Sequence, residues 1–84
     1  MLRVSVISPE RVLYEGEAAS VVAPAFDGEV GILTSHAPMV ALLGRGELRL
    51  TTSGGTQRFA VEGGFVQVAD NVVRVVTEKA GPAD

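Results

Sequence analysis

Short apolar runs alternate with turn residues along the whole chain, and many of the runs carry a polar residue at every second position. Leu2, Val4 and Val6 alternate with polar neighbours, and Leu48 and Leu50 repeat the pattern. A period of two is typical of a strand with one buried face, because successive side chains point to opposite sides. Helical spacing is nearly absent. The pattern predicts strands over residues 2–8, 12–15, 17–23, 30–33, 39–43, 47–52, 57–62, 65–68 and 72–77.

Turn residues separate these runs. Gly16 and Pro24 are expected to end the strands that contain them, and Ser53-Gly54-Gly55 is a hairpin signal, because adjacent glycines supply the positive φ values that tight turns need. Gly63-Gly64 and Asp70-Asn71 mark two further breaks. About nine or ten short strands with tight turns indicate an all-β domain. A two-sheet antiparallel sandwich buries such strands best, and a small closed barrel is the alternative.

The length of 84 residues predicts one domain, over residues 1–78, followed by a short polar tail at 79–84. The net charge is −3 and no Lys or Arg cluster is present, which argues against a nucleic-acid partner. The absence of cysteine excludes disulfides and thiolate metal sites. No uncharged run approaches the roughly 20 residues of a membrane span. Any work at a membrane would therefore proceed through a partner.

Candidate chemistry is concentrated in residues 26–38, which hold the single histidine. Ser35 and His36 are sequence neighbours on an extended segment, so their side chains point apart, which argues against a catalytic triad with Asp27 or Glu29. A zinc site needs three or four ligands, and one His without Cys does not supply them. The sequence predicts no catalytic, cofactor-binding or metal-binding residue.

A contact surface fits the same segment better. Asp27-Gly28 is a turn signal, and the strand after it carries a carboxylate, Glu29, among the apolar residues Val30, Ile32 and Leu33. A peripheral charge beside apolar anchors is how small interfaces gain affinity and register. From these residues alone, a solvated turn charge and a carboxylate presented to a basic partner remain equally open.

The segment from Gly28 to Pro38 resembles the G-E-[LV]-G-I-x-x-x-H-A-P signature of the epsilon subunit of the F-type ATP synthase. Other stretches resemble that family in the same order: residues 6–10 its first turn, 46–50 its G-x-[LI]-R-[IL] strand, and 62–68 its G-G-F-x-E-V run. Gln67 replaces the usual Glu, and Arg74 and Thr77-Glu78 depart from the common ending of the last strand.

The resemblance implies a ten-stranded β-sandwich of two five-stranded antiparallel sheets. It implies a non-catalytic central-stalk subunit without a cofactor, which couples rotation of the proton-driven c-ring to the gamma shaft and meets the alpha and beta subunits through the assembled complex. The expected place is the cytoplasmic face of the bacterial inner membrane, as a peripheral membrane protein. An unrelated β-sandwich protein- or ligand-binding module is the alternative, and a small hydrolase lacks a credible constellation of residues.

The resemblance also assigns contact residues. Contacts to gamma are expected from Ser8, His36 and Ala41. Contacts to the c-ring are expected from Asp27, Gly28, Glu29, Val30, Gly31, Ile32 and Leu33. The chain stops at Asp84, where the family continues into a helical hairpin that restrains ATP hydrolysis, so that restraint is expected to be absent here or to come from another chain.

Overall fold

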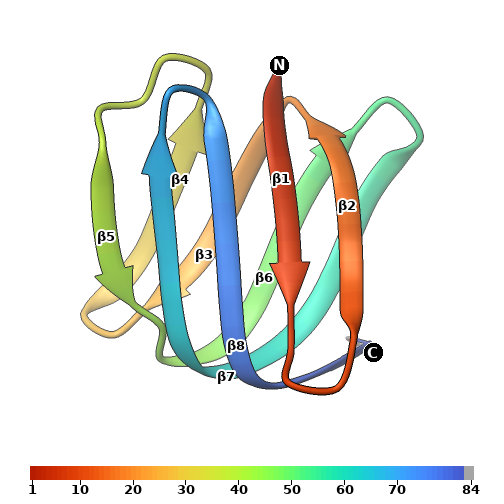
Figure 1. The fold of residues 1–84 in the computed structure, drawn as a ribbon, viewed down its shortest axis with the longest axis vertical. Coiled ribbons are helices and arrows are strands. Elements are labelled where there is room, and N and C mark those ends of the chain that lie inside the picture. The colour runs from red at the N-terminus through yellow and green to blue at the C-terminus, as the bar shows by residue number, and fades with distance from the viewer. Residues whose placement is uncertain (83–84) are drawn as a thin grey trace.

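The computed structural model describes residues 1–82 and contains eight strands and no helix in that range (Figure 1). The strands are β1 (Leu2–Ile7), β2 (Val12–Ala18), β3 (Ser20–Ala25), β4 (Gly28–Leu33), β5 (Met39–Leu42), β6 (Arg45–Thr52), β7 (Gly55–Ala69) and β8 (Val72–Pro82). Most correspond to a predicted run; β7 joins two runs that the sequence pattern keeps apart, and β8 extends the last predicted run into the expected tail.

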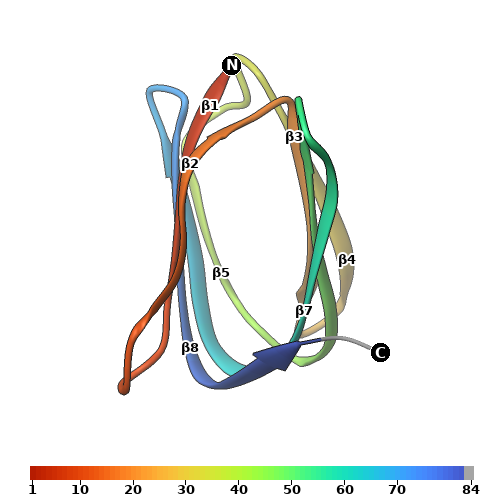
Figure 2. The ribbon, with the colours of Figure 1, turned by 90° about the vertical axis from the view of Figure 1, so that its right-hand side faces the viewer.

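The strands form two layers that face each other across the core (Figure 2). The front sheet of Figure 1 consists of β5, the second half of β7, the first part of β8, β1 and β2. The back sheet consists of β4, β3, β6, the first half of β7 and the last part of β8. Because β7 and β8 each contribute to both sheets, eight strands give two sheets of five, and the predicted sandwich is confirmed.

Both long strands bend where they pass from one sheet to the other. In β7 the bend falls at Gly63 and Gly64, whose φ angles are 74° and 103°, a region that favours glycine. In β8 it falls at Thr77, which is 1% exposed. The Thr77 hydroxyl donates to the carbonyl oxygen of Lys79 at 2.8 Å and lies 3.4 Å from that of Glu62. The glycines thus do not end the strand but let it change sheets.

One pairing departs from the antiparallel expectation. β1 runs parallel to β8, with Val4 opposite Val73 and Val6 opposite Val75, whereas β1 and β2 pair antiparallel. The alternation of apolar residues fixes which face of a strand is buried but not the direction of its neighbour. The parallel pair is therefore a property of the tertiary fold.

Two expected strand ends are wrong. β2 continues through Gly16, which lies opposite Val4. β3 continues through Pro24 to Ala25, and Pro24 pairs with Glu29 of β4. The pairing of β3 with β6 covers residues 20–22 alone, so the N–H that proline lacks costs no bond to β6.

The expected tail is also wrong as far as it is described. Lys79 and Ala80 lie opposite Glu62 and Val61 in the pairing of β8 with β7, and the pairing extends to Pro82 opposite Phe59. The segment is polar in sequence because one of its faces meets solvent, while Ala80 packs against the core. Residues 83 and 84 lie outside the described residues.

The core lies between the sheets and is built by alternation. The fully buried large side chains are Leu2, Ile32, Leu48, Leu50, Val4, Val6, Val21, Val66, Val68, Val73, Val75 and Thr77. Burial of each Leu, Ile or Val contributes about 1.5–3 kcal/mol relative to exposure. Since nearly every strand contributes, the sandwich packs as one rigid body. No helix among the described residues is long and apolar enough to cross a membrane.

Candidate docking surface

β4 and β5 are edge strands on the same side of the sandwich, one in each sheet (Figure 1). Four large apolar side chains on or beside them are exposed: Phe26 by 80%, Leu33 by 63%, Val40 by 68% and Leu42 by 66%. The backbone N–H of Phe26 donates to the carbonyl oxygen of Leu42 at 2.8 Å, which joins the β3–β4 turn to β5. These four residues are called the apolar edge below. Phe26 lies beside Leu42, which shares the outer face of the front sheet with Val40, whereas Leu33 lies on the outer face of the back sheet. Exposed apolar side chains of this size on edge strands are typical of contact surfaces.

The apolar edge continues as a row across the outer face of the front sheet. Leu42 lies opposite Phe65, Phe65 opposite Val76, Val76 opposite Ile7, and Ile7 opposite Val12. Neighbouring strands are about 4.8 Å apart, so this apolar row spans roughly 20 Å. The next row along these strands is mostly polar: Val40, Gln67, Arg74, Ser5 and Glu15.

Glu29 lies on the outer face of the back sheet, where Arg49 binds it. The Glu29 Oε2 atom is 3.4 Å from Nη1 of Arg49, and the same nitrogen is 3.5 Å from Oε1 of Glu47. One guanidinium therefore serves two carboxylates, and the group of three keeps a net negative charge. The Glu29 side chain is 57% exposed, and an exposed pair of this kind stabilises by at most about 1 kcal/mol. A cation from a partner can therefore replace Arg49 at Glu29.

Only some of the side chains between Asp27 and Leu33 that were expected to contact the c-ring are exposed. Asp27, Glu29 and Leu33 are exposed, whereas Val30 is half-buried against the core. Ile32 is 0% exposed, so its side chain has no surface to offer, and the expectation of a contact through it is wrong. The reason is alternation: Val30 and Ile32 share the inner face of β4.

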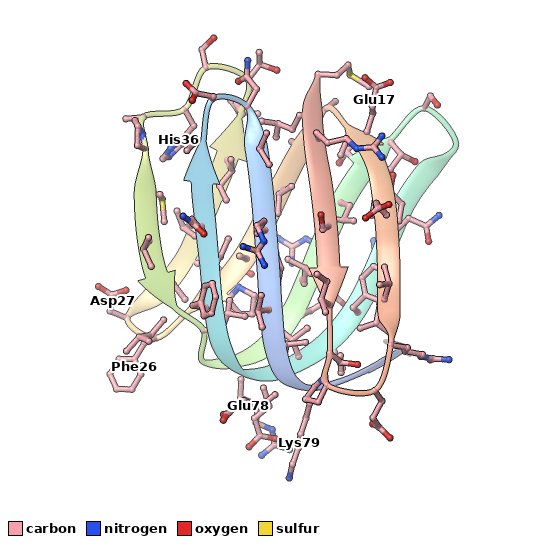
Figure 3. All side chains as sticks on the ribbon, in the orientation of Figure 1. Glu17, Phe26, Asp27, His36, Glu78 and Lys79 are labelled. Atoms are coloured by element: carbon pink, nitrogen blue, oxygen red, sulfur yellow. The ribbon has the colours of Figure 1, made fainter. Side chains whose placement is uncertain are left out.

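The loop between β4 and β5, residues 34–38, carries His36 at the end of the sandwich opposite Phe26 and Asp27 (Figure 3). His36 is half-buried, its Nδ1 atom lies 2.6 Å from the carbonyl oxygen of Ala37, and its backbone N–H donates to the Leu33 carbonyl oxygen at 3.1 Å. Ser35 has a φ of 68° and donates its N–H to Oδ1 of Asn71 at 2.6 Å. The histidine therefore sits on a loop that is fixed at several points.

Ala41 belongs to the front sheet and Ser8 to the β1–β2 loop at the end of that sheet, and both side chains turn toward the protein. Ser8 is 8% exposed, and its hydroxyl donates to the Arg11 carbonyl oxygen at 3.2 Å and accepts the Arg11 N–H at 3.3 Å. Ala41 is half-buried against the core. The loop with Ser8 lies at the end of the sandwich opposite His36 (Figure 1). The three candidates lie in the front sheet or in loops next to it, but they do not form one cluster.

The sequence reasoning missed the outward residues of β5, Val40 and Leu42. Residues 39–42 are all apolar, and such a run shows no alternation from which an outer face can be deduced. Only the pairing with β7 shows that Met39 and Ala41 face the core, leaving the other two side chains exposed.

The described residues offer little for catalysis or metal binding. No three His, Asp or Glu side chains within residues 1–82 are placed to hold a metal ion. A cavity of about 380 Å³ lies on the opposite side of the sandwich from the apolar edge, lined by Arg11, Val12, Leu13, Gln57, Arg58 and Phe59. Its lining contains neither a carboxylate nor a histidine.

The sandwich, the apolar edge and the partly neutralised carboxylate define a small all-β domain whose surface is suited to docking on other proteins. The family model described as "ATP synthase, Delta/Epsilon chain, beta-sandwich domain" matches residues 1–83. The chain belongs to this family, as the resemblance of its motifs implies.

Relatives and solved structures agree with this assignment. The ATP synthase epsilon chain of Rhodopirellula baltica is 48% identical over 83 residues, which is 99% of this chain and 65% of the relative. That of Leptospira borgpetersenii is 49% identical over 77 residues, 92% of this chain and 61% of the relative. A chain in the Euglena gracilis mitochondrial ATP synthase superposes with a TM-score of 0.88 at 27% identity, covering 96% of this chain and 52% of that one.

A chain in the Tetrahymena thermophila mitochondrial ATP synthase central stalk and c-ring has a TM-score of 0.81 at 17% identity, which shows the shared fold. It covers 96% of this chain and 66% of that one. The chain spans only 61–65% of the length of the epsilon chains of Rhodopirellula baltica and Leptospira borgpetersenii.

Proposed function

We propose that this domain is the rotor-coupling part of an epsilon subunit in an F-type ATP synthase. It is non-catalytic and connects the proton-driven c-ring to the gamma shaft. The observation that carries the proposal is the apolar edge on β4 and β5, together with the exposed carboxylate of Glu29 on β4, in a chain that belongs to the delta/epsilon family. The solved relatives come from assemblies described as containing the c-ring and the central stalk.

The c-ring contact is proposed at the β3–β4 turn and the outer face of β4. Asp27, Glu29 and Leu33 offer two carboxylates and one apolar side chain to the solvent there. A Cβ added at Gly28 or at Gly31 would meet no atom within 4 Å, so the backbone of β4 is open to close approach. Basic groups on the loops of the c-ring are the partner chemistry that this surface fits.

The gamma contact is proposed on the front sheet. Ala41 belongs to that sheet, Ser8 and His36 lie in loops next to opposite ends of it, and the apolar row lies between Ser8 and Ala41. We assign the direct contact to the outward side chains of Val40 and Leu42, because Ala41 faces the core. An apolar row bordered by a polar row is the composition expected of a protein–protein interface.

The assembled complex brings the domain near the alpha and beta subunits and holds it at the membrane surface as a peripheral protein. In a bacterium this is the cytoplasmic face of the inner membrane. A second class of function, an unrelated ligand-binding module, has weaker support, because the chain belongs to the delta/epsilon family.

Glu29→Lys tests the proposal. Reversal of this charge places a cation beside Arg49 and opposite the basic groups of the c-ring. We expect the affinity of the epsilon-containing central stalk for the c-ring to fall by about tenfold or more, and proton-coupled ATP synthesis to fall with it. The measurement is ATP synthesis in membrane vesicles whose synthase carries the variant chain, together with the amount of the chain retained on the membranes.

Glu17→Lys is the matched control, because Glu17 is exposed, makes the same charge change and lies on β2, far from β4 (Figure 3). It is expected to leave both quantities unchanged. Normal synthesis and normal retention with Glu29→Lys, in a folded chain, would overturn the c-ring contact. Absence of the wild-type chain from the synthase would overturn the proposed function itself.

A further inference from the structure

The hairpin turn between β7 and β8 reaches the loop that carries His36. Asp70 and Asn71 are the two central residues of this turn, with φ angles of 51° and 63°. Positive φ at both central positions is the geometry of a type I′ turn, which asparagine and aspartate tolerate better than other residues with side chains. The turn lies at the same end of the sandwich as the β4–β5 loop (Figure 1).

Asn71 joins three segments that are far apart in the sequence. Its Oδ1 atom accepts the N–H of Ser35 at 2.6 Å, across 36 residues. Its backbone carbonyl oxygen accepts the N–H of Arg3 at 2.8 Å. One residue thus ties the β4–β5 loop to the β7–β8 turn and to the start of β1.

The bond to Ser35 meets a local need. Ser35 is an exposed residue without glycine's freedom, yet it adopts a φ of 68°. A conformation of this kind persists only where surrounding contacts impose it. The side-chain oxygen of Asn71 fixes the Ser35 N–H, and the next N–H, of His36, bonds to Leu33.

We propose that Asn71 is a positioning residue that holds the β4–β5 loop, and with it His36, in the conformation used for docking. The side chain of Asn71 acts through Ser35 and does not itself touch the partner. The docking part of this inference rests on the proposed gamma contact, whereas the positioning part rests on the geometry alone.

Three variants of the full chain separate the side-chain oxygen from the backbone of the turn. Asn71→Gly keeps the left-handed backbone and removes Oδ1. Asn71→Asp keeps an acceptor oxygen at the same place. Asp70→Gly is the control: it places a glycine at the other central position of the turn, and among the described residues the Asp70 side chain makes no hydrogen bond to the β4–β5 loop. All three accept the φ values of the turn, so each is expected to fold.

The first readout is amide hydrogen exchange at Ser35, measured by NMR without any partner. Loss of one hydrogen bond is expected to accelerate exchange there by about fivefold in Asn71→Gly. Asn71→Asp and Asp70→Gly are expected to exchange at the wild-type rate. Unchanged exchange at Ser35 in Asn71→Gly would overturn the positioning role.

The second readout is affinity for isolated gamma subunit. Asn71→Gly is expected to bind about fivefold more weakly, with binding restored in Asn71→Asp and unchanged in Asp70→Gly. Faster exchange with wild-type affinity would overturn the docking role of the loop. If the wild-type chain does not bind gamma, the proposed function fails, while exchange at Ser35 still decides whether Asn71 positions the loop.

Discussion

Two adjacent glycines, Gly63 and Gly64, occupy the bend where β7 passes from one sheet to the other. A Cβ on Gly64 would overlap the carbonyl oxygen of Val76 and lie 2.8 Å from Cα of Thr77, both part of the paired strand β8. At Gly63 the nearest atom belongs to the carboxylate of Glu78, the end of a flexible side chain that is able to move. A side chain is therefore expected to be tolerated less well at Gly64 than at Gly63.

Gly64→Ala is expected to destabilise the domain by about 3 kcal/mol or more, because backbone strain and a clash with main-chain atoms add. Gly63→Ala is expected to cost about 1–2 kcal/mol, the strain of a left-handed residue alone. Urea unfolding followed by circular dichroism measures both changes.

Gly31→Ala is the control, because no atom lies within 4 Å of the added Cβ and the position is an exposed one on β4. Its stability is expected to stay within about 0.5 kcal/mol of wild type. Equal losses at Gly63 and Gly64 would contradict the importance of the main-chain clash.

At the scale of elements, β6 and β7 carry two arginines directly opposite each other. Arg49 pairs with Arg58 across the back sheet, and like charges in that relation are destabilising. The carboxylates of Glu29 and Glu47 next to Arg49 compensate for this repulsion. Glu29 therefore has two roles. It reduces the repulsion between Arg49 and Arg58 in the back sheet, and it belongs to the proposed contact surface on β4.

Charge reversal at the two arginines is expected to have opposite effects. Arg58→Glu creates an attractive cross-strand pair with Arg49 and is expected to stabilise by about 0.5 kcal/mol. Arg49→Glu also faces an arginine, Arg58, but it removes both ion pairs and gathers three carboxylates, so it is expected to destabilise by about 0.5 kcal/mol. The urea midpoint at low salt measures both, and 1 M salt is expected to shrink the difference because it screens exposed charges. The same sign of change in both variants would contradict this account.

At the scale of the whole molecule, the sandwich separates two contact regions on a stiff body. The proposed c-ring contact uses the outer face of the back sheet and the proposed gamma contact uses the outer face of the front sheet, and the closely packed core between the two sheets deforms little under load. A body of this kind passes a force from one bound partner to another. The two proposed contacts therefore need not touch in order to be coupled mechanically.

Leu42→Lys tests the front-sheet contact at this scale. Leu42 is 66% exposed and begins the apolar row, so the change is expected to leave stability within about 0.5 kcal/mol and to weaken gamma binding by about tenfold or more. Isothermal titration calorimetry with isolated gamma measures the affinity.

Val72→Lys is the comparison, because Val72 is a 43% exposed residue of the same sheet but lies outside the apolar row. It is expected to bind gamma as the wild type does. Equal weakening by both variants would show that the lysines act through charge, and would contradict a specific contact at the apolar row.

The sequence by itself determined the all-β class, the approximate position of most strands, most of the core and the family. Alternation places Leu2, Val4 and Val6 inside, as found, because side chains on a strand must take opposite faces. Turn chemistry located the Asp70-Asn71 turn, since few residues accept positive φ there. The Gly28–Pro38 motif indicated the family that the comparison then showed.

Only the tertiary structure decided which strands are neighbours and what each surface offers. The parallel pairing of β1 with β8 and the ion pair of Glu29 with Arg49 join residues that are distant in sequence, and β7 runs on through Gly63-Gly64 because its two halves pair in different sheets. Local sequence propensity does not predict such contacts, because they form and stabilise the protein only when the strands assemble and the sheets pack. For the same reason the sequence assigned Ile32 to a surface and overlooked Leu42, whose directions depend on the partner strands.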